Sequence, residues 1–409
     1  MEKDSCYVGI DLNDSYAMVS YYQSGMSEPG TVSMIAGSEN FHIPALLARR
    51  GSTGMWYYGE EAKKMAQTSE VICVDALPKR AVAAEVIGVG GESYEAVDLL
   101  AMFLRKITEL PQKLGNAAKA DRLVITVERL TKENMEVFWK VAEKLDFTEG
   151  NFMVLDHKES FYYFALSQQE QLWRHDVFLY VCERDLVYSC ALKRDPTTRP
   201  QVVTIQESGR RILKEPKDQT FTDILTKEFE SRTVSSVYLV GDGFDSGWMK
   251  NSINFICKGR RAFMGQNLFS KGACYAGAAK DRGDRWPFIY MGENVMKFNL
   301  SIQVQEAGRS VFFNLVSAGK NWFEEKGSCE VILSGSPAVE FWKQLPDSRE
   351  AVAETVELTD LPERPDRTTR LLISAKPLSD DKIGIEIKDL GFGEMFRATN
   401  RVWKYTVVM

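Results

Sequence analysis

The stretch that most constrains the fold runs from residue 7 to residue 22. Val8, Ile10 and Leu12 are apolar at every second position, which is the period of a strand with one buried face. Asp11 opens a short polar turn, and the residues after this turn are again β-prone. The pattern predicts a β-hairpin with an acidic residue at the end of its first strand. Two interpretations are open: an ordinary hairpin, or a hairpin that surrounds a ligand.

The composition is that of a globular chain, and it disfavours several classes of function. The 409 residues are 44% hydrophobic and 26% charged, which fits about two or three domains. A net charge of −6 argues against a nucleic-acid surface, because such surfaces are basic. No apolar run approaches the ~18 residues of a membrane helix, and the N-terminus lacks the apolar core of a signal peptide. We therefore expect a cytoplasmic protein without membrane insertion.

The cysteines and histidines predict neither a disulfide framework nor a metal site. The seven cysteines are odd in number and scattered without paired spacing, as expected for reduced thiols. His42, His157 and His175 are far apart in the sequence, whereas a zinc site needs clustered ligands. The sequence therefore indicates no metal ligands, and we assign no residue a catalytic role.

Residues up to about 285 alternate strand patterns with helix patterns. The stretch 92–110 carries one apolar stripe and predicts a helix, with Ser93 as its N-cap and Pro111 as its stop. A buried strand is predicted at 122–127, and Thr131 is expected to cap the next helix. This alternation indicates an α/β fold.

A second hairpin is predicted from Asp176 to Lys193, and a later strand ends in the turn Gly241-Asp242-Gly243. From Phe288 onward the pattern changes to short alternating strands. They are expected at 297–304, 329–333, 370–375, 382–388 and 403–407. Several strands at regular spacing, separated by Gly, Pro, Asp and Ser, indicate a β-sandwich.

These motifs, in this order, resemble the seventy-kilodalton heat-shock chaperones of the actin-like ATPase superfamily. The first turn, which begins at Asp11, is similar to the family's D-L-G-T-T-N. Residues 236–245 resemble I-V-L-V-G-G-S-T-R, and residues 267–278 resemble N-P-D-E-A-V-A-Y-G-A-A. The last two motifs, at this spacing, are the most specific part of the resemblance.

The resemblance implies an α/β actin-like ATPase fold of two lobes, followed by a C-terminal β-sandwich domain. Lobe I is expected at residues 1–175 and a truncated lobe II at 176–285. The β-sandwich, similar to the chaperone substrate-binding domain, is expected at 286–409. We expect a degenerate form that lacks the family's helical lid.

The resemblance also implies a nucleotide site, with ATP or ADP and magnesium as the candidate cofactor. Its candidate residues are Asp11, Asn13, Asp14, Ser15, Lys79, Asp156, Gly241, Asp242 and Gly243. Asp11 would order the magnesium shell, and Asn13 replaces a glycine because asparagine tolerates a left-handed backbone. Lys79 has two interpretations: the family's catalytic lysine, or one of an exposed basic pair after a proline turn.

Several positions depart from the family pattern. Where the family has an Asp and three glycines in its second phosphate-binding turn, this chain has Val181, Glu183, Arg184 and Asp185. Side chains at glycine positions should block the close approach of backbone to phosphate. Asp14 adds a carboxylate beside the phosphates, and one like-charge pair at ~4 Å costs on the order of 4 kcal/mol at an effective dielectric of about 20. The water-orienting Glu of the family aligns with His157. We therefore expect ATP hydrolysis to be lost or negligible.

Three functions compete. The first is a chaperone-like pseudo-ATPase that acts as a protein-binding scaffold. The second is an ATP-binding chaperone, ATPase or small-molecule kinase of the same superfamily with altered phosphate loops. The third is an actin-like filament or membrane-associated assembly factor. The altered second turn disfavours the second function, and the β-domain disfavours the third. The expected partner is a protein or peptide, and the oligomeric state is open.

The β-domain is expected to be an interaction module, because it carries no clustered His, Cys or Ser-His-Asp set. Trp322-Phe323 and Phe341-Trp342 are expected at an exposed binding edge, since aromatic side chains bury a large area at small entropic cost. Trp403 lies on an alternating strand and is expected in the core.

Overall fold

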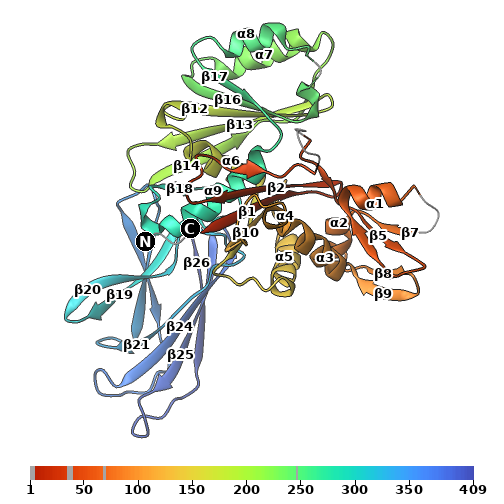
Figure 1. Cartoon of the computed structure of the whole chain (residues 1–409). Helices are drawn as coiled ribbons and strands as arrows, with labels where there is room; N and C mark the ends of the chain where they lie inside the picture. Colours follow the sequence, from red (N-terminus) through yellow and green to blue (C-terminus); the bar gives the residue numbers. More distant parts are fainter. Residues whose placement is uncertain (1–4, 35–39, 68–70, 246) are drawn as a thin grey trace. The chain divides into compact units, whose positions relative to one another are not determined.

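The computed structural model describes residues 5–34, 40–67, 71–245 and 247–409 (Figure 1). The chain divides into two compact units, and each is described by itself. The first unit comprises Met1–Lys193 and Ile205–Trp286, and the second comprises Arg194–Thr204 and Pro287–Met409. The first unit is mixed α/β and the second is built of strands.

The N-terminal hairpin lies in the middle of the first sheet. β1 (Cys6–Leu12) pairs antiparallel with β2 (Tyr16–Gln23) and parallel with β10 (Arg122–Val127). β11 (Phe152–Asp156) pairs parallel with β10, and β3 (Gly30–Thr31) closes the other side, which gives the order β11-β10-β1-β2-β3. The hairpin predicted from the alternation at Val8, Ile10 and Leu12 is therefore confirmed.

A second sheet of the first unit repeats this arrangement. β12 (Asp176–Glu183) pairs antiparallel with β13 (Leu186–Asp195) and parallel with β16 (Val234–Val240). β17 (Arg261–Met264) pairs parallel with β16, so the order is β17-β16-β12-β13. β15 (Arg211–Ile212) also pairs with β13. In both sheets the first strand of the hairpin pairs in parallel with a third strand, and this strand pairs in parallel with a fourth.

The helices follow the same repeat. α5 (Lys132–Lys144) lies between β10 and β11 in the chain, as α8 (Lys250–Ile256) lies between β16 and β17. α6 (His157–Leu166) follows β11, as α9 (Leu268–Arg282) follows β17. α7 (Lys217–Phe229) precedes β16. The two halves of the first unit therefore share the order hairpin, then strand, helix, strand and helix, with other elements between the hairpin and that run (Figure 1).

Most of the remaining elements of the first unit lie between β3 and β10. They are β4 (Ile43–Pro44), β5 (Leu47–Arg50), β6 (Trp56–Tyr58), α1 (Gly59–Met65), β7 (Val71–Val74), α2 (Leu77–Val82), β8 (Val86–Val89), β9 (Glu92–Glu95), α3 (Ala96–Thr108) and α4 (Leu110–Lys113). The 3-10 turn η1 (Glu170–Leu172) lies between α6 and β12.

The prediction of one helix over 92–110 was partly wrong. Residues 92–95 form β9, which pairs with β8, and the helix begins only at Ala96. Ser93 therefore lies in a strand, and the N-cap is Glu95, which makes no side-chain cap bond. Pro111 lies in the first turn of α4, where proline's missing N–H costs nothing. In contrast, Thr131 caps α5 as expected, in a reciprocal pair with Asn134.

The second unit contains two four-stranded antiparallel sheets, in the orders β20-β19-β22-β23 and β21-β24-β25-β26. Their strands are β19 (Asn299–Glu306), β20 (Arg309–Val316), β21 (Gly327–Leu333), β22 (Ala338–Gln344), β23 (Ala351–Glu357), β24 (Thr369–Ser379), β25 (Lys382–Gly391) and β26 (Val402–Val408). Residues of both sheets share one hydrophobic core. β14 (Gln201–Glu207) and β18 (Phe288–Tyr290) also pair, in parallel.

The aromatic side chains of the second unit are only partly where they were expected. Phe341 was expected at an exposed edge, and this was wrong: it is fully buried in the shared core because it points inward from β22. Trp342, the next residue, is half-buried and contacts the ring of Phe312 at 5.6 Å between centroids. Trp322 packs partly buried against the core. Trp403 does so too, as expected for it, and its indole Nε1 donates to the carbonyl of Thr359 at 3.0 Å.

Candidate functional site

The first candidate turn, between β1 and β2, satisfies its own backbone donors. Asn13 Oδ1 accepts hydrogen bonds from the N–H groups of Ser15 and Tyr16, both at 2.8 Å. Asparagine tolerates a left-handed backbone, but the φ of Asn13 is not positive. Instead, the side-chain oxygen of Asn13 accepts hydrogen bonds from within the turn and stabilises it. Two N–H groups that could face an anion therefore already have an acceptor.

Asp14 and Lys79 are brought together, although they lie 65 positions apart in the sequence. Asp14 Oδ1 accepts a hydrogen bond from the backbone N–H of Lys79 at 3.0 Å. Lys79 is the third residue of α2, so the carboxylate satisfies a donor of the first turn of that helix. The Lys79 side chain is exposed. Asp14 thus ties the hairpin turn to α2.

Asp11, at the end of β1, is buried and paired with a histidine. Asp11 Oδ1 lies 2.8 Å from Nε2 of His157, the first residue of α6. When the carboxylate is ionised it can only accept, so Nε2 donates. The His157 ring stacks on the ring of Phe269, with 3.8 Å between centroids and 7° between planes. The histidine therefore gives a buried carboxylate a hydrogen-bond donor and is itself fixed by stacking.

Asp156 lies beside this pair but has a structural task. It is the N-cap of α6, and its Oδ1 accepts a hydrogen bond from the N–H of Glu159 at 2.8 Å. A buried carboxylate in this position satisfies a helix donor and interacts favourably with the helix dipole.

The second candidate turn, between β12 and β13, is also satisfied from within. Arg184 has a left-handed φ of 57°, and its N–H donates to Asp242 Oδ1 at 2.8 Å. Gly241 and Gly243 allow this close approach. A Cβ at Gly241 would lie 2.2 Å from the carbonyl oxygen of Cys182, and one at Gly243 would lie 2.5 Å from the carbonyl oxygen of Arg184. The two glycines therefore leave room for the backbone of the second hairpin to approach closely.

Carboxylates from both hairpins act on one aromatic residue. Burial, reinforced by Asp11, Glu183 and Asp242, raises the pKa of Tyr16 to about 12. Tyr16 contacts the ring of His42 at 4.1 Å between centroids. Burial lowers the pKa of His42, although Asp11 and Asp242 are among the carboxylates that oppose the shift. The region near Asp11 therefore has a negative field.

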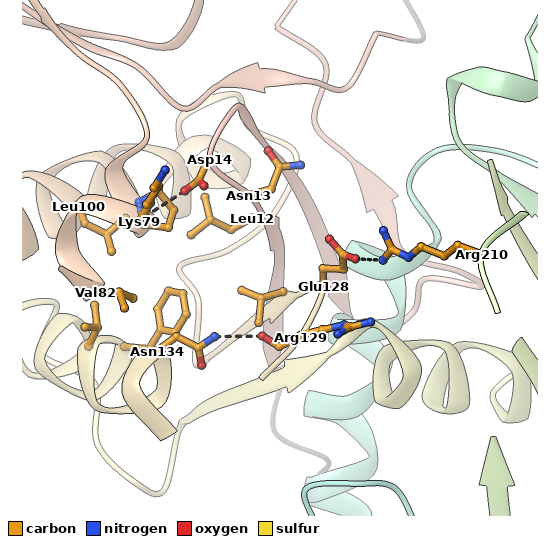
Figure 2. Close-up of a pocket in the computed structure, with 14 residues that line it drawn as sticks. Leu12, Asn13, Asp14, Lys79, Val82, Leu100, Glu128, Arg129, Asn134 and Arg210 are labelled. Atoms are coloured by element: carbon orange, nitrogen blue, oxygen red, sulfur yellow. Dashed lines mark hydrogen bonds and ion pairs between the residues drawn. The ribbon is translucent and has the colours of Figure 1, made fainter. Parts of the chain in front are cut away.

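A pocket of about 640 Å³ is lined in part by the first turn (Figure 2). Its apolar residues are Leu12, Pro78, Val82, Leu100, Val127, Val137 and Phe138. Its charged residues are Asp14, Lys79, Glu128, Arg129 and Arg210. Figure 2 shows Glu128 joined to Arg210, and Asn134 joined to the backbone of Arg129 at 3.0 Å. The volume is in the range of small-molecule sites.

Three of these charged residues were missed by the sequence analysis. Glu128 and Arg129 directly follow the strand predicted at 122–127, and charges at the carboxyl end of a parallel strand are a general indication of a site. Arg210 could not have been found, because it reaches Glu128 across 82 positions of sequence. Its guanidinium also lies 5.0 Å from the ring centroid of Tyr188.

The described residues hold no group of three or more His, Cys, Asp or Glu side chains arranged to bind a metal ion. Within the same residues, no helix combines the length and apolarity that crossing a membrane requires.

Fold and site together define a two-part protein: a mixed α/β unit with a pocket at the ends of β1 and β10, and a β-rich C-terminal part. The chain belongs to the family of unknown function (DUF5716) C-terminal, which matches residues 28–293. A domain of unknown function (DUF8552) matches residues 295–409. No curated protein matches the chain.

Proposed function

We propose that this protein is a chaperone-like pseudo-ATPase of the actin-like superfamily, which binds protein as a cytoplasmic scaffold and does not hydrolyse ATP. The observation that carries the proposal is the state of the two central turns. The N–H groups of Ser15, Tyr16 and Arg184 already donate to Asn13 and Asp242. Phosphate oxygens would have to displace these acceptors.

The repeated order of elements supports the actin-like part of the proposal. Sheets β11-β10-β1-β2 and β17-β16-β12-β13 have the same pairing directions, and each is completed by helices at corresponding places in the chain. Two related halves built around two hairpins are what the resemblance to the chaperones implies.

Charge supports the loss of ATP turnover. Burial raises the pKa of Tyr16, and Asp11, Glu183 and Asp242 add to this shift, so negative charge gathers near this residue of the first hairpin. Each like-charge pair at ~4 Å costs on the order of 4 kcal/mol at an effective dielectric of about 20. Asp11, the residue expected to order magnesium, is engaged with His157.

The second unit supports the protein-binding part. β20 and β23 are the end strands of one sheet, and β21 and β26 are those of the other. End strands carry unpaired backbone groups that can pair with an extended segment. β20 also exposes Phe312 and Phe313, and β23 exposes Val352. An extended apolar peptide segment of a protein partner matches this surface.

The test is calorimetric titration of the whole chain with MgATP and MgADP, together with an ATPase assay. We expect no binding heat and no turnover above background. Magnesium-dependent hydrolysis that Asp11→Ala abolishes would overturn the proposal. A permanently unfolded test protein, titrated in parallel, should bind. If it does not, the scaffold role fails while the loss of ATPase activity stands.

A further inference from the structure

The pocket in the first unit has an apolar wall that meets solvent. Val82, near the end of α2, is 43% exposed even though it lines the pocket. Leu100 of α3 and Phe138 of α5 are buried behind the same wall. An apolar ligand body laid against Val82 would remove this surface from water, which is favourable in proportion to the area covered.

Two cations of the pocket rim, Lys79 and Arg129, have no acidic partner among the residues that the structure describes. Within residues 5–34, 40–67, 71–245 and 247–409, the side chains of Lys79 and Arg129 form no ion pair or hydrogen bond. The two acidic residues of the rim are engaged: Asp14 accepts from the backbone of Lys79, and Glu128 is paired with Arg210. The pocket therefore presents positive charge whose counter-ion is missing from its own lining.

The balance of charge in the lining determines the charge of the missing counter-ion. The lining contains three cations, Lys79, Arg129 and Arg210, against two carboxylates, Asp14 and Glu128. A surplus of one positive charge suits a monoanion. A triphosphate would carry several negative charges toward the same two carboxylates. Lys79 lies on the same side of the pocket as Val82 and Leu100, and Arg129 lies across from them (Figure 2).

We propose that this pocket binds an amphipathic monocarboxylate, with an aliphatic or aromatic body against Val82 and a carboxylate at Arg129. A guanidinium accepts a carboxylate through two parallel hydrogen bonds, which an ammonium cannot do. Arg129 also precedes Thr131, the N-cap of α5, so the positive end of the helix dipole adds to its field. Lys79 contributes at longer range. The inference goes beyond the scaffold function and does not depend on it.

The experiment is calorimetric titration of the whole chain with octanoate. 1-Octanol, which has the same body without charge, and octylammonium, which has the opposite charge, are the comparison ligands. We expect octanoate to bind at least roughly tenfold more tightly than either, as the loss of a charge-assisted hydrogen bond implies. Equal binding of octylammonium, or no binding of octanoate, would overturn the proposal.

Two pairs of variants locate the site. Val82→Glu places a carboxylate on the apolar wall and should abolish octanoate binding, whereas Val86→Glu, at an exposed valine of β8 outside the pocket, should not change it. Arg129→Met should weaken binding roughly tenfold, and Arg349→Met, an exposed arginine of the second unit, should have no effect. Unchanged affinity in Val82→Glu would place the ligand elsewhere and refute the inference.

A parallel ATPase assay with MgATP separates this inference from the proposed function. Magnesium-dependent hydrolysis would contradict the pseudo-ATPase and leave the octanoate result standing. Failure of octanoate alone would contradict only the carboxylate site.

Discussion

Asp242 Oδ1 accepts a hydrogen bond from the backbone N–H of Arg184 at 2.8 Å. The two residues come from different turns, one after β12 and one after β16, and the contact closes the second hairpin with a carboxylate of the protein. Asn13 closes the first hairpin in the same manner. Removing these acceptors should therefore weaken the fold.

Asp242→Ala should lower the free energy of unfolding by about 1 kcal/mol, because the Arg184 N–H loses its acceptor. Asp242→Asn retains an acceptor oxygen and should cost less. Urea denaturation of both variants measures the difference. If alanine and asparagine cost the same, the hydrogen bond is not the source of the effect.

The Asp11–His157 pair should behave as one unit. Asp11→Ala and His157→Ala should each cost about 1–3 kcal/mol, since each leaves a partly buried polar partner unpaired. The double variant should cost less than the sum of the two by at least about 0.5 kcal/mol. A double-mutant cycle from urea denaturation gives this coupling. Strict additivity would mean that the stacking of His157 on Phe269, and not the carboxylate, fixes the histidine.

In the second unit, Arg364 and Asp389 form a buried ion pair that should dominate acid stability. Both terminal guanidinium nitrogens of Arg364 donate to Asp389 at 2.9 Å, and the carboxylate is fully buried. Asp389 also accepts from the N–H groups of Gly391 and Thr399 and from the Thr399 hydroxyl. Asp389→Asn should cost about 3 kcal/mol at pH 7, because it leaves the Arg364 charge buried without its counter-ion.

The pH dependence of this effect follows from the direction of the shift. Burial by itself would raise the pKa of Asp389, but Arg364, Thr399 and Gly391 lower it below the ordinary value of 3.8. A carboxyl group whose folded pKa is lowered stabilises the fold above its unfolded pKa, and that stabilisation is lost as the pH falls through the folded pKa. The difference between wild type and Asp389→Asn should therefore be full at pH 7 and shrink below about pH 4. Glu386→Gln, at an exposed pair with Lys404, should show a much smaller effect at either pH.

The proposed peptide surface can be tested at its edge. Phe312→Lys, on end strand β20, should reduce binding of an unfolded test protein, because a charge on an end strand opposes pairing with an added strand. Leu378→Lys is the matched control: this leucine is equally exposed, at 57% in both cases, but belongs to inner strand β24. Binding by fluorescence anisotropy should fall in the first variant only. An equal loss in both would indicate a general charge effect.

The local parts of the fold were predictable where a short pattern has one physical reading. The alternation at Val8, Ile10 and Leu12 predicted β1, and Thr131 predicted the start of α5. Ser93 misled because β8 pairs with residues 92–95, and this pairing is stronger than the local capping preference. The prediction for Phe341 was wrong because turn residues nearby in the sequence do not determine which face of β22 its side chain lies on.

The site was predictable only in part, for a related reason. The sequence indicated Asn13, Asp14 and Lys79 as candidates, and all three line the pocket. It did not indicate that Asp14 accepts from the backbone of Lys79 or that Asn13 accepts from Ser15 and Tyr16, because short motifs carry no information on which acceptor reaches a donor first. Arg210 lies at the pocket only because the fold brings it next to Glu128.

The self-closed hairpins also bear on how this chain responds to its surroundings. A ligand that binds the native state stabilises it in proportion to the logarithm of its concentration. In these turns the acceptors are the side chains of Asn13 and Asp242, which belong to the protein itself. Their stabilising effect therefore does not depend on the concentration of any ligand. On the proposed function, the free energy of unfolding should therefore not change with the concentration of ATP.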